Sequence, residues 1–214
     1  MPSANRNITD EEIQRAAGLL KAGGVVVFPM DTVYGVGADA SNEGAVARIY
    51  AVKGRPADRP LQLSLADPED LQRVAADLSR DALSLARRFL PGPLTLVVRG
   101  AGTVAATVAA GGGTVGVRVP DHAVPLRLAR LVGPLAVTSA NVSGQPAPIT
   151  AEEASRQIGH RVDLVLDGGP CPLAGESTVV DVTVSPPRIL RQGVLSREAL
   201  ERALGSAIPA SAAE

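Results

Sequence analysis

Polar and cationic residues that could bind a phosphate compound gather at two places in the sequence. In the first, an apolar run over 25–28 leads into PMDTVYG at 29–35, and Lys53 and Arg55 follow a helical segment. In the second, an apolar run leads into TSANVSG at 138–144. Polar loops after strands are where open α/β sheets bind ligands, and a Lys and an Arg close together can hold an anion. These segments predict a site for a small polar molecule together with a phosphate compound.

The composition excludes several other kinds of site. The net charge of −1 gives no overall attraction to nucleic acid or to anionic membranes, and 2% aromatic residues are too few for base-stacking platforms. The single cysteine, Cys171, forms no internal disulfide, and His122 and His160 make no metal-ligand pattern. The N-terminus lacks an apolar signal core and no run reaches the length of a membrane span. We therefore expect a soluble, cytoplasmic protein.

Hydrophobic periodicity predicts helices and strands that alternate, with several consecutive strands near the C-terminus. Thr9 with Glu12 and Thr150 with Glu153 have the spacing of capping boxes. The expected helices cover 10–22, 42–52, 122–132, 151–159 and 196–204, and two more begin after Asp67 and Ser79. The expected strands cover 24–28, 61–65, 94–99, 114–119, 135–138, 163–167, 178–184 and 188–192. This order predicts an α/β fold with a mixed sheet, as one domain over 9–204, and a frayed tail over 205–214.

Two familiar phosphate-binding motifs do not account for these residues. GVGADA at 35–40 matches the G-x-G-x-x-A dinucleotide spacing. In that motif the glycines follow a strand at once and open a helix, whereas here Gly35 comes well after Phe28 and the next helix cap is Asn42. The chain has no G-x-x-x-x-G-K-[ST] motif. We therefore expect side chains and local amides to bind the phosphates.

Several long blocks, in one order, resemble the YrdC-domain family in its short, single-domain form. The blocks are 23–59 with KGR at 53–55, PGPLTLVV at 91–98, TVGVRVPDH at 114–122, TSANVSG at 138–144, ESTVVD at 176–181 and ILRQG at 189–193. The resemblance implies a twisted mixed parallel and antiparallel sheet with helices packed on it and a concave active-site cleft. It also implies a nucleotidyltransferase activity, the condensation of L-threonine, bicarbonate or CO2 and ATP to threonylcarbamoyl-AMP and pyrophosphate. That product serves the threonylcarbamoyl-adenosine modification next to the anticodon of tRNAs that read codons starting with A.

The resemblance also implies roles for particular residues. Those implied to be catalytic are Lys53, Arg55, Ser139 and Asn141. Those implied to bind threonine are Thr32, Ser64, Arg118, Thr138 and Ser177. Those implied to bind ATP are Lys53, Arg55, Arg59, Thr114, Ser139, Ala140, Asn141, Ala147 and Arg191. Without the resemblance, Lys53 and Arg55 would suit a solvated helix end equally well.

This chain departs from the family pattern at four of its positions. Met30 stands where the family usually has Thr, Ser64 where some members have His, Ala147 where Ser is frequent, and Arg59 where Lys or Asn is frequent. None of these changes removes the K-x-R pair of Lys53 and Arg55. We therefore expect the chemistry to be retained with altered affinities.

The resemblance implies partners as well. Mg2+ is expected with ATP, and Asp31 and Asp181 are candidate helpers without a recognisable ligand set. The expected partners are ATP, L-threonine, bicarbonate and a downstream threonylcarbamoyl-transferase complex of the TsaD, TsaB and TsaE type, with weak or indirect tRNA binding and no membrane. The alternatives are a paralogue on the same fold, including a carbamoyl-transfer module of the hydrogenase-maturation type, and an RNA-binding protein without this activity. The lone Cys171 opposes the hydrogenase-maturation module, which normally carries zinc-finger-like cysteines.

Overall fold

A nine-stranded sheet forms the centre of the part of the chain that the computed structural model describes, residues 7–101 and 108–209. The strand order is β7-β1-β2-β6-β3-β5-β4-β8-β9. The pairs β1–β7, β3–β5 and β4–β8 are parallel and the other neighbours are antiparallel, which confirms the mixed sheet. The strands are β1 Val26–Phe28, β2 Gly35–Asp39, β3 Gln62–Ser64, β4 Leu94–Arg99, β5 Thr114–Arg118, β6 Leu135–Ser139, β7 Leu164–Val165, β8 Thr178–Asp181 and β9 Arg188–Arg191.

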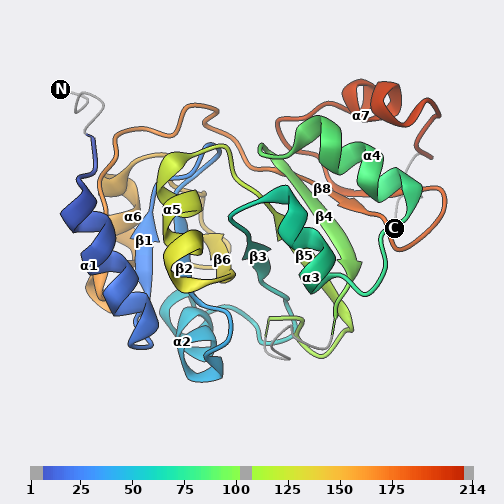
Figure 1. The fold of residues 1–214 in the computed structure, drawn as a ribbon. Coiled ribbons are helices and arrows are strands. Elements are labelled where there is room, and N and C mark those ends of the chain that lie inside the picture. Colours follow the sequence, from blue (N-terminus) through green and yellow to red (C-terminus); the bar gives the residue numbers. More distant parts are fainter. Residues whose placement is uncertain (1–6, 102–107, 210–214) are drawn as a thin grey trace.

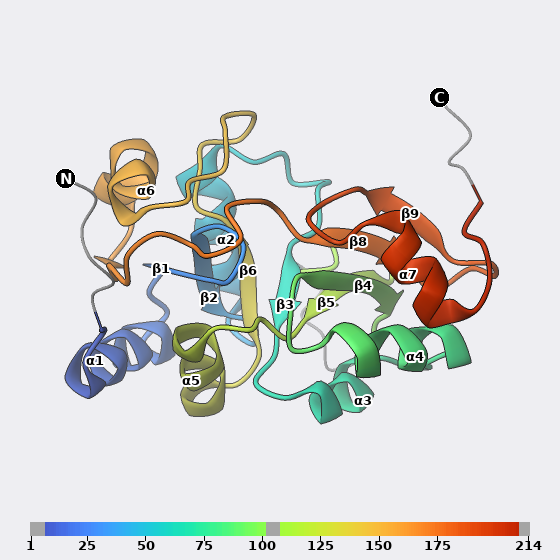
Figure 2. The same ribbon diagram turned by 90° about the horizontal axis from the view of Figure 1, so that it is seen from above.

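Helices cover the two faces of this sheet unequally. Figures 1 and 2 show α1, α3, α4 and α5 along one face, α2 and α6 on the other side near β1 and β2, and α7 against α4. The helices are α1 Asp10–Lys21, α2 Glu43–Lys53, α3 Leu71–Val74, α4 Arg80–Phe89, α5 Ala123–Val132, α6 Ala151–Ile158 and α7 Arg197–Leu204, with short 3-10 turns at Pro68–Asp70 and Gly159–Arg161. On the face of β3, β4 and β5 away from α3 and α4, the side chains include the polar residues Gln62, Thr95 and Arg118.

Side-chain caps begin most of these helices where the sequence predicts them. At α1 the Glu12 amide donates to Thr9 Oγ1 at 3.2 Å and the Thr9 amide donates to Glu12 Oε2 at 2.9 Å, so this capping box is confirmed. At α6 only one of the two hydrogen bonds of the second predicted capping box forms, so this prediction is wrong in part. Thr150 accepts from the Glu153 amide at 3.2 Å, but the Glu153 carboxylate accepts from the Ile149 amide at 2.8 Å, one residue beyond the cap.

The sequence prediction misses strand β2, and this strand explains the G-x-G spacing. Gly35–Asp39 runs antiparallel to both β1 and β6. A Cβ built on Gly35 would lie 2.8 Å from Met30 Sδ, and one built on Gly37 would lie 3.0 Å from the Phe28 ring. The glycines therefore make room for two buried side chains in the middle of a sheet, and the rejection of a dinucleotide-binding loop is confirmed. Met30, a departure from the family pattern, fills the space over Gly35.

Three predicted elements are much shorter than expected, and the strands predicted at 24–28 and 61–65 are each two residues shorter. The strand predicted at 163–167 is limited to Leu164–Val165, and the one at 178–184 ends at Asp181. Asp181 Oδ1 accepts from the Thr183 amide at 2.9 Å, which turns the chain out of the sheet. The helix expected after Asp67 is a 3-10 turn followed by the single turn of α3. The tail expected at 205–214 begins with Gly205, the C-cap of α7, and its residues 210–214 lie outside the described residues.

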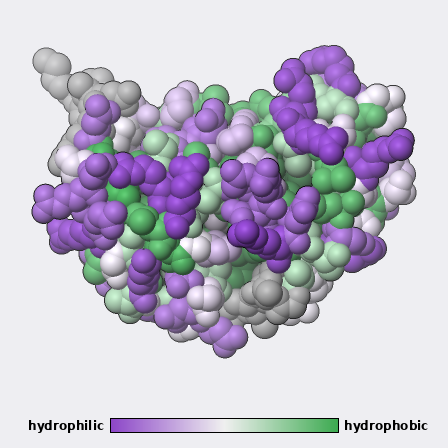
Figure 3. Space-filling view, in the orientation of Figure 1, coloured by the Kyte–Doolittle hydropathy of each residue, from purple (hydrophilic) through white to green (hydrophobic). Residues whose placement is uncertain are grey.

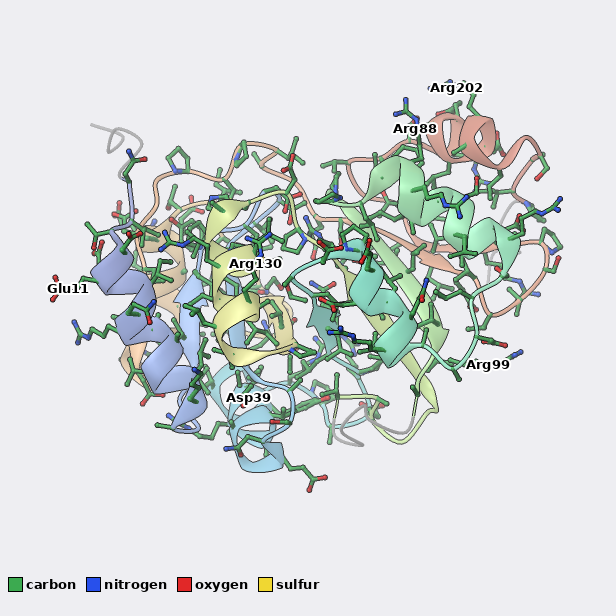
Figure 4. All side chains as sticks on the ribbon, in the orientation of Figure 1. Glu11, Asp39, Arg88, Arg99, Arg130 and Arg202 are labelled. Carbon is green, nitrogen blue, oxygen red and sulfur yellow. The ribbon has the colours of Figure 1, made fainter. Side chains whose placement is uncertain are left out.

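Apolar side chains cover both faces of the half of the sheet that contains β1, β2 and β6. Ile13 and Leu20 of α1 pack with Leu128 of α5 in one buried cluster, and most of the remaining core forms a second cluster. On the helix-covered face, hydrophilic and hydrophobic side chains are interspersed (Figure 3). The charged ends of Arg88 and Arg202 extend from its rim (Figure 4). Within the described residues, no helix is long and apolar enough to cross a membrane.

Candidate functional site

One cavity gathers polar residues from segments that are far apart in the sequence. On β3, β4 and β5, Leu63, Leu96 and Val117 belong to the core cluster that also contains Leu85 of α4. Because side chains alternate along a strand, Gln62, Thr95 and Arg118 point to the other side, where they line the cavity. Figure 2 shows the segment between α2 and β3 on this side of the sheet, away from α3 and α4, and its residues Arg55, Pro60 and Leu61 line the cavity.

The cavity contains half of the residues to which the resemblance gives roles. Those in its lining are Thr32, Arg55, Arg118, Thr138, Ser139, Ser177 and Arg191. Those outside its lining are Lys53, Arg59, Ser64, Thr114, Ala140, Asn141 and Ala147. The lining includes hydroxyls and three guanidinium groups and no Lys, His or Cys. Such a set holds anions and hydrogen-bonds small polar groups.

Arg118 is a buried arginine whose donors are held by the protein from three directions. Its Nε donates to the Gly92 carbonyl at 3.0 Å, Nη1 donates to Thr32 Oγ1 at 2.8 Å, and Nη2 forms a short ion pair with Asp31 Oδ1. Burial lowers the pKa of the Arg118 guanidinium, and the Asp31 carboxylate opposes that shift. Asp31 Oδ2 is buried without a hydrogen-bond partner in the described part of the chain. The ion pair with Asp31 therefore holds the Arg118 guanidinium in place next to Thr32, and both Arg118 and Thr32 line the cavity.

Lys53 is buried outside the lining of the cavity and supports the segment that follows β6. Its side chain is 1% exposed, and its Nζ donates to the Ser139 carbonyl, to the Asn141 carbonyl at 2.6 Å and to Asn141 Oδ1 at 3.1 Å. Three acceptors match the three hydrogens of an ammonium group. Ser139 Oγ donates to the same Asn141 Oδ1 at 2.6 Å. In this geometry Lys53 positions Ser139 and Asn141, and its predicted contact with phosphate remains a prediction.

The burial of Lys53 should make stability depend on pH. Burial, reinforced by the positive charge of Arg55, lowers the pKa of the Lys53 ammonium from its ordinary 10.5 to about 7. Between these pH values the unfolded chain binds more protons at this residue than the folded chain, so the free energy of unfolding should rise with pH. We expect wild type to gain up to about 1.4 kcal/mol per pH unit relative to Lys53→Met above pH 7. Urea unfolding of both proteins at pH 7, 8 and 9 measures this difference, and parallel pH profiles would contradict it.

Arg55 reaches the cavity because helix α2 ends at Lys53 and its C-cap, Gly54, comes just before Arg55. Gly54 caps the helix in the left-handed region, at φ 59°, which turns the chain away from the helix axis. Arg55 Nε then donates to the Arg59 carbonyl at 3.1 Å, and Nη2 donates to the Pro60 carbonyl at 3.0 Å. Burial and the neighbouring Arg59 and Arg191 charges lower the pKa of Arg55, against the effect of Tyr50. The local positive potential favours a bound anion.

Arg191 also lines the cavity and is fixed there by Glu176 and Ser177. Its Nη1 forms an ion pair with Glu176 Oε1 at 2.8 Å, and its Nη2 donates to the Ser177 carbonyl at 2.9 Å and to Ser177 Oγ at 3.2 Å. Arg191 lies on β9 next to a register shift at Val179 and Val180 of β8. The guanidinium is therefore oriented before any ligand is bound.

The remaining predicted residues occupy other surroundings. Ser64 is fully buried, and its Oγ has no hydrogen-bond partner within the described residues. Thr114 pairs with Arg99 at the end of β5 away from Arg118, about 13 Å along the strand. Ala147 lines a separate hollow beside α6. Arg59 contributes its carbonyl, which accepts from Arg55 and from the Tyr50 hydroxyl.

Sequence reasoning missed Gln62, Thr95 and Glu176, which all line the cavity. Glu176 lies just before the recognised Ser177, and its charge opposes that of Arg191. Gln62 and Thr95 are polar residues within predicted strands that are otherwise mostly apolar. A polar residue on the alternating face of a buried strand is the signal that could have identified both of them.

The described residues do not form a protein ligand set for a metal ion. Among them, no group of three or more His, Cys, Asp and Glu residues is placed to hold one. Asp31 is turned to Arg118, and Asp181 Oδ1 accepts from the Thr183 amide and hydroxyl. The two aspartates singled out from the sequence therefore have other partners, and a divalent ion here would need oxygen ligands from the substrate.

Comparisons with known proteins agree with one another. A family model described as Sua5, YciO and YrdC, telomere recombination, matches residues 18–193. A threonylcarbamoyl-AMP synthase of Pyrococcus abyssi is 41% identical over 95% of this chain, which spans 60% of that relative. A putative threonylcarbamoyl-AMP synthase of Mycobacterium tuberculosis is 42% identical over 90% of this chain and 89% of the relative. The crystal structure of P. abyssi Sua5 complexed with L-threonine superposes with a TM-score of 0.91 over 95% of this chain and 60% of that one, at 41% identity.

Proposed function

Because the chain belongs to the Sua5, YciO and YrdC family, we propose that it is an L-threonylcarbamoyladenylate synthase, which condenses L-threonine, bicarbonate or CO2 and ATP and releases pyrophosphate. The observation that carries this proposal is that three guanidinium groups and several hydroxyl groups line the same cavity. The 41% identity to a P. abyssi threonylcarbamoyl-AMP synthase supports it, as does the likeness to the threonine complex of the Sua5 from that organism.

In this proposal, the threonine binds at the Arg118 end of the cavity. Arg118 receives the substrate carboxylate, because a planar guanidinium donates to a carboxylate through two parallel hydrogen bonds. Thr32 Oγ1 accepts from Arg118 Nη1 at 2.8 Å and keeps its own proton for a ligand oxygen. Thr138 and Ser177 supply further hydroxyls in the lining. Ser64 is assigned to threonine binding only through its position in the family pattern, because it is buried and lies outside the cavity lining.

The phosphates of ATP bind toward Arg55 and Arg191, and Ser139 faces the same space. A carbamate formed on the threonine amine attacks the α-phosphate through an oxygen, and the P–O bond to pyrophosphate breaks. Negative charge grows on the phosphoryl oxygens and on the leaving group, so fixed cations and positioning supply the catalysis. Mg2+ enters as the chelate of ATP, bound through phosphate oxygens and water. Lys53 holds Ser139 and Asn141 in place for this chemistry.

The product would serve the modification of tRNA through a transferase complex of the TsaD, TsaB and TsaE type. The hydrogenase-maturation alternative has a counterpart among solved structures at 23% identity, and that likeness extends to the fold only. The RNA-binding alternative is not favoured, because hydrogen-bond donors from seven separate segments of the chain line one cavity of small-molecule size. Its test is salt-dependent RNA binding without ATP turnover.

The decisive experiment follows pyrophosphate release from ATP and Mg2+ in CO2-free buffer. Bicarbonate and L-threonine are added separately and together, and L-serine replaces threonine as the control. We expect release only when threonine and bicarbonate are both present, with threonylcarbamoyl-AMP identified by mass. Release without threonine would point to another acceptor on this fold. Folded, ATP-binding protein that released none would overturn the proposal.

A further inference from the structure

A chain of hydrogen bonds crosses the floor of the cavity and ends at a residue without an assigned role. Arg191 Nη2 on β9 donates to Ser177 Oγ at 3.2 Å. Ser177 Oγ and Thr95 Oγ1, on β4, lie 2.9 Å apart. Thr95 Oγ1 donates to Gln62 Oε1, on β3, at 3.1 Å. Ser177 and Thr95 are 3% and 2% exposed, so bulk water does not compete for the bond between their hydroxyls.

A donor at one end and an acceptor at the other give this hydrogen-bond chain one direction. The Arg191 guanidinium can only donate, so Ser177 Oγ accepts from it. The Thr95 proton goes to Gln62 Oε1, so the bond between the two hydroxyls must use the Ser177 proton. In this arrangement the Gln62 carboxamide has its oxygen turned to Thr95. Its NH2 group, which donates two hydrogen bonds and accepts none, is left for the cavity that Gln62 lines.

A glycine on the intervening strand allows the last bond of the chain to form. In the sheet order, β5 lies between β3 and β4, and Gly116 is the β5 residue opposite Gln62. A Cβ on Gly116 would lie 3.1 Å from Thr95 Cγ2 and 3.5 Å from Gln62 Cβ. The missing side chain thus lets Thr95 and Gln62 meet across β5. Gly116 has an ordinary backbone conformation, so its use here is space and not conformational freedom.

We propose that Gln62 binds the carboxylate-sized anion of the reaction, bicarbonate or the carbamate made from it. This inference rests on the proposed function and deepens it, since it assigns the third substrate to a residue. Strand β3 lies between β6, which carries Ser139, and β5, which carries Arg118. Gln62 therefore stands between Ser139, which is assigned to the nucleotide, and Arg118, which is assigned to the threonine carboxylate. A neutral N–H donor orients such an oxygen and withdraws less of its charge than a cation would, which suits an oxygen that must attack phosphorus.

The test compares Michaelis constants for the three substrates in CO2-free buffer, with pyrophosphate release as the readout. Gln62→Glu keeps an acceptor for Thr95 and replaces the NH2 donors with a negative oxygen. We expect the KM for bicarbonate to rise by about tenfold or more, at least the value of one lost donor at 1.4 kcal/mol, and the KM for ATP to rise by a smaller factor, because the new charge also repels the phosphates. Gln14→Glu makes the same chemical change on the exposed face of α1 and should leave all three constants unchanged.

Variants of the other residues in this hydrogen-bond chain test whether Gln62 must be held in one orientation to bind the anion. Thr95→Val removes the hydroxyl that fixes the amide and should raise the KM for bicarbonate, whereas Thr95→Ser should restore it. Gly116→Ala, whose new methyl group meets Thr95, should act in the same direction as Thr95→Val. Thermal unfolding of each variant shows that it is folded.

Each outcome decides between explanations. Unchanged constants in Gln62→Glu, with wild type dependent on bicarbonate, would overturn the role of Gln62 and leave the proposed function standing. A rise confined to the KM for ATP would assign Gln62 to a phosphate and overturn the proposal equally. A wild type whose pyrophosphate release is independent of bicarbonate would overturn both.

Discussion

Arg118→Ala should lower the free energy of unfolding by about 3–5 kcal/mol, because it leaves the buried Asp31 carboxylate without its partner. Asp31 is 2% exposed, and one of its oxygens already lacks a hydrogen-bond partner among the described residues. The same substitution should raise the KM for threonine more than the KM for ATP, since the threonine carboxylate loses its bidentate donor. Chemical denaturation and steady-state kinetics measure the two effects on one protein preparation.

A double variant separates the structural loss from the functional one. Arg118→Met combined with Asp31→Leu removes both buried charges and replaces them with apolar groups of similar size. Replacement of a whole buried ion pair is often neutral for stability, so we expect stability near that of wild type and a KM for threonine that stays high. Recovery of threonine affinity together with stability would show that Arg118 acts only on the fold. Equal increases in the KM for threonine and for ATP would lead to the same conclusion.

Arg55→Ala should lower kcat/KM for ATP by about a hundredfold or more, the loss typical of one donor aimed at developing negative charge. Arg55 lines the cavity, and its two protein acceptors are carbonyls of its own exposed loop, at Arg59 and Pro60. Water can replace a donor at such carbonyls, so the free energy of unfolding should change by less than about 0.5 kcal/mol. Kinetics with ATP varied, together with urea unfolding, measures both quantities.

Arg15→Ala is the matched control, because Arg15 is exposed on α1 and lies outside the cavity lining. It removes the same side chain and the same charge from the protein and should leave kcat/KM for ATP near the wild-type value. If both variants lost activity equally, the effect of Arg55 would be one of overall charge. If Arg55→Ala were as active as wild type, the assignment of Arg55 to the phosphates would be wrong.

The helices and the type of sheet were within reach of the sequence. Capping residues such as Thr9, Asn42, Ser79 and Ser196 act within one turn of chain, so their effect can be deduced from local spacing. Strand β2 was missed because GVGAD has little β-propensity of its own. It is a strand because β1 and β6 pair with it on both sides and because its glycines admit Met30 and Phe28.

The sequence by itself determined the residue types of the candidate site. The blocks at 29–35, 53–55, 138–144 and 176–181 and the arginines at 118 and 191 could be recognised without coordinates. Only the tertiary structure decided which of them share a cavity. Lys53 and Arg55 are two residues apart, yet the helix end at Gly54 leaves Lys53 buried against the Ser139 and Asn141 carbonyls and sends Arg55 into the lining. Gln62 and Thr95 meet across a third strand at Gly116. Such contacts depend on sheet order and register, which local sequence does not encode.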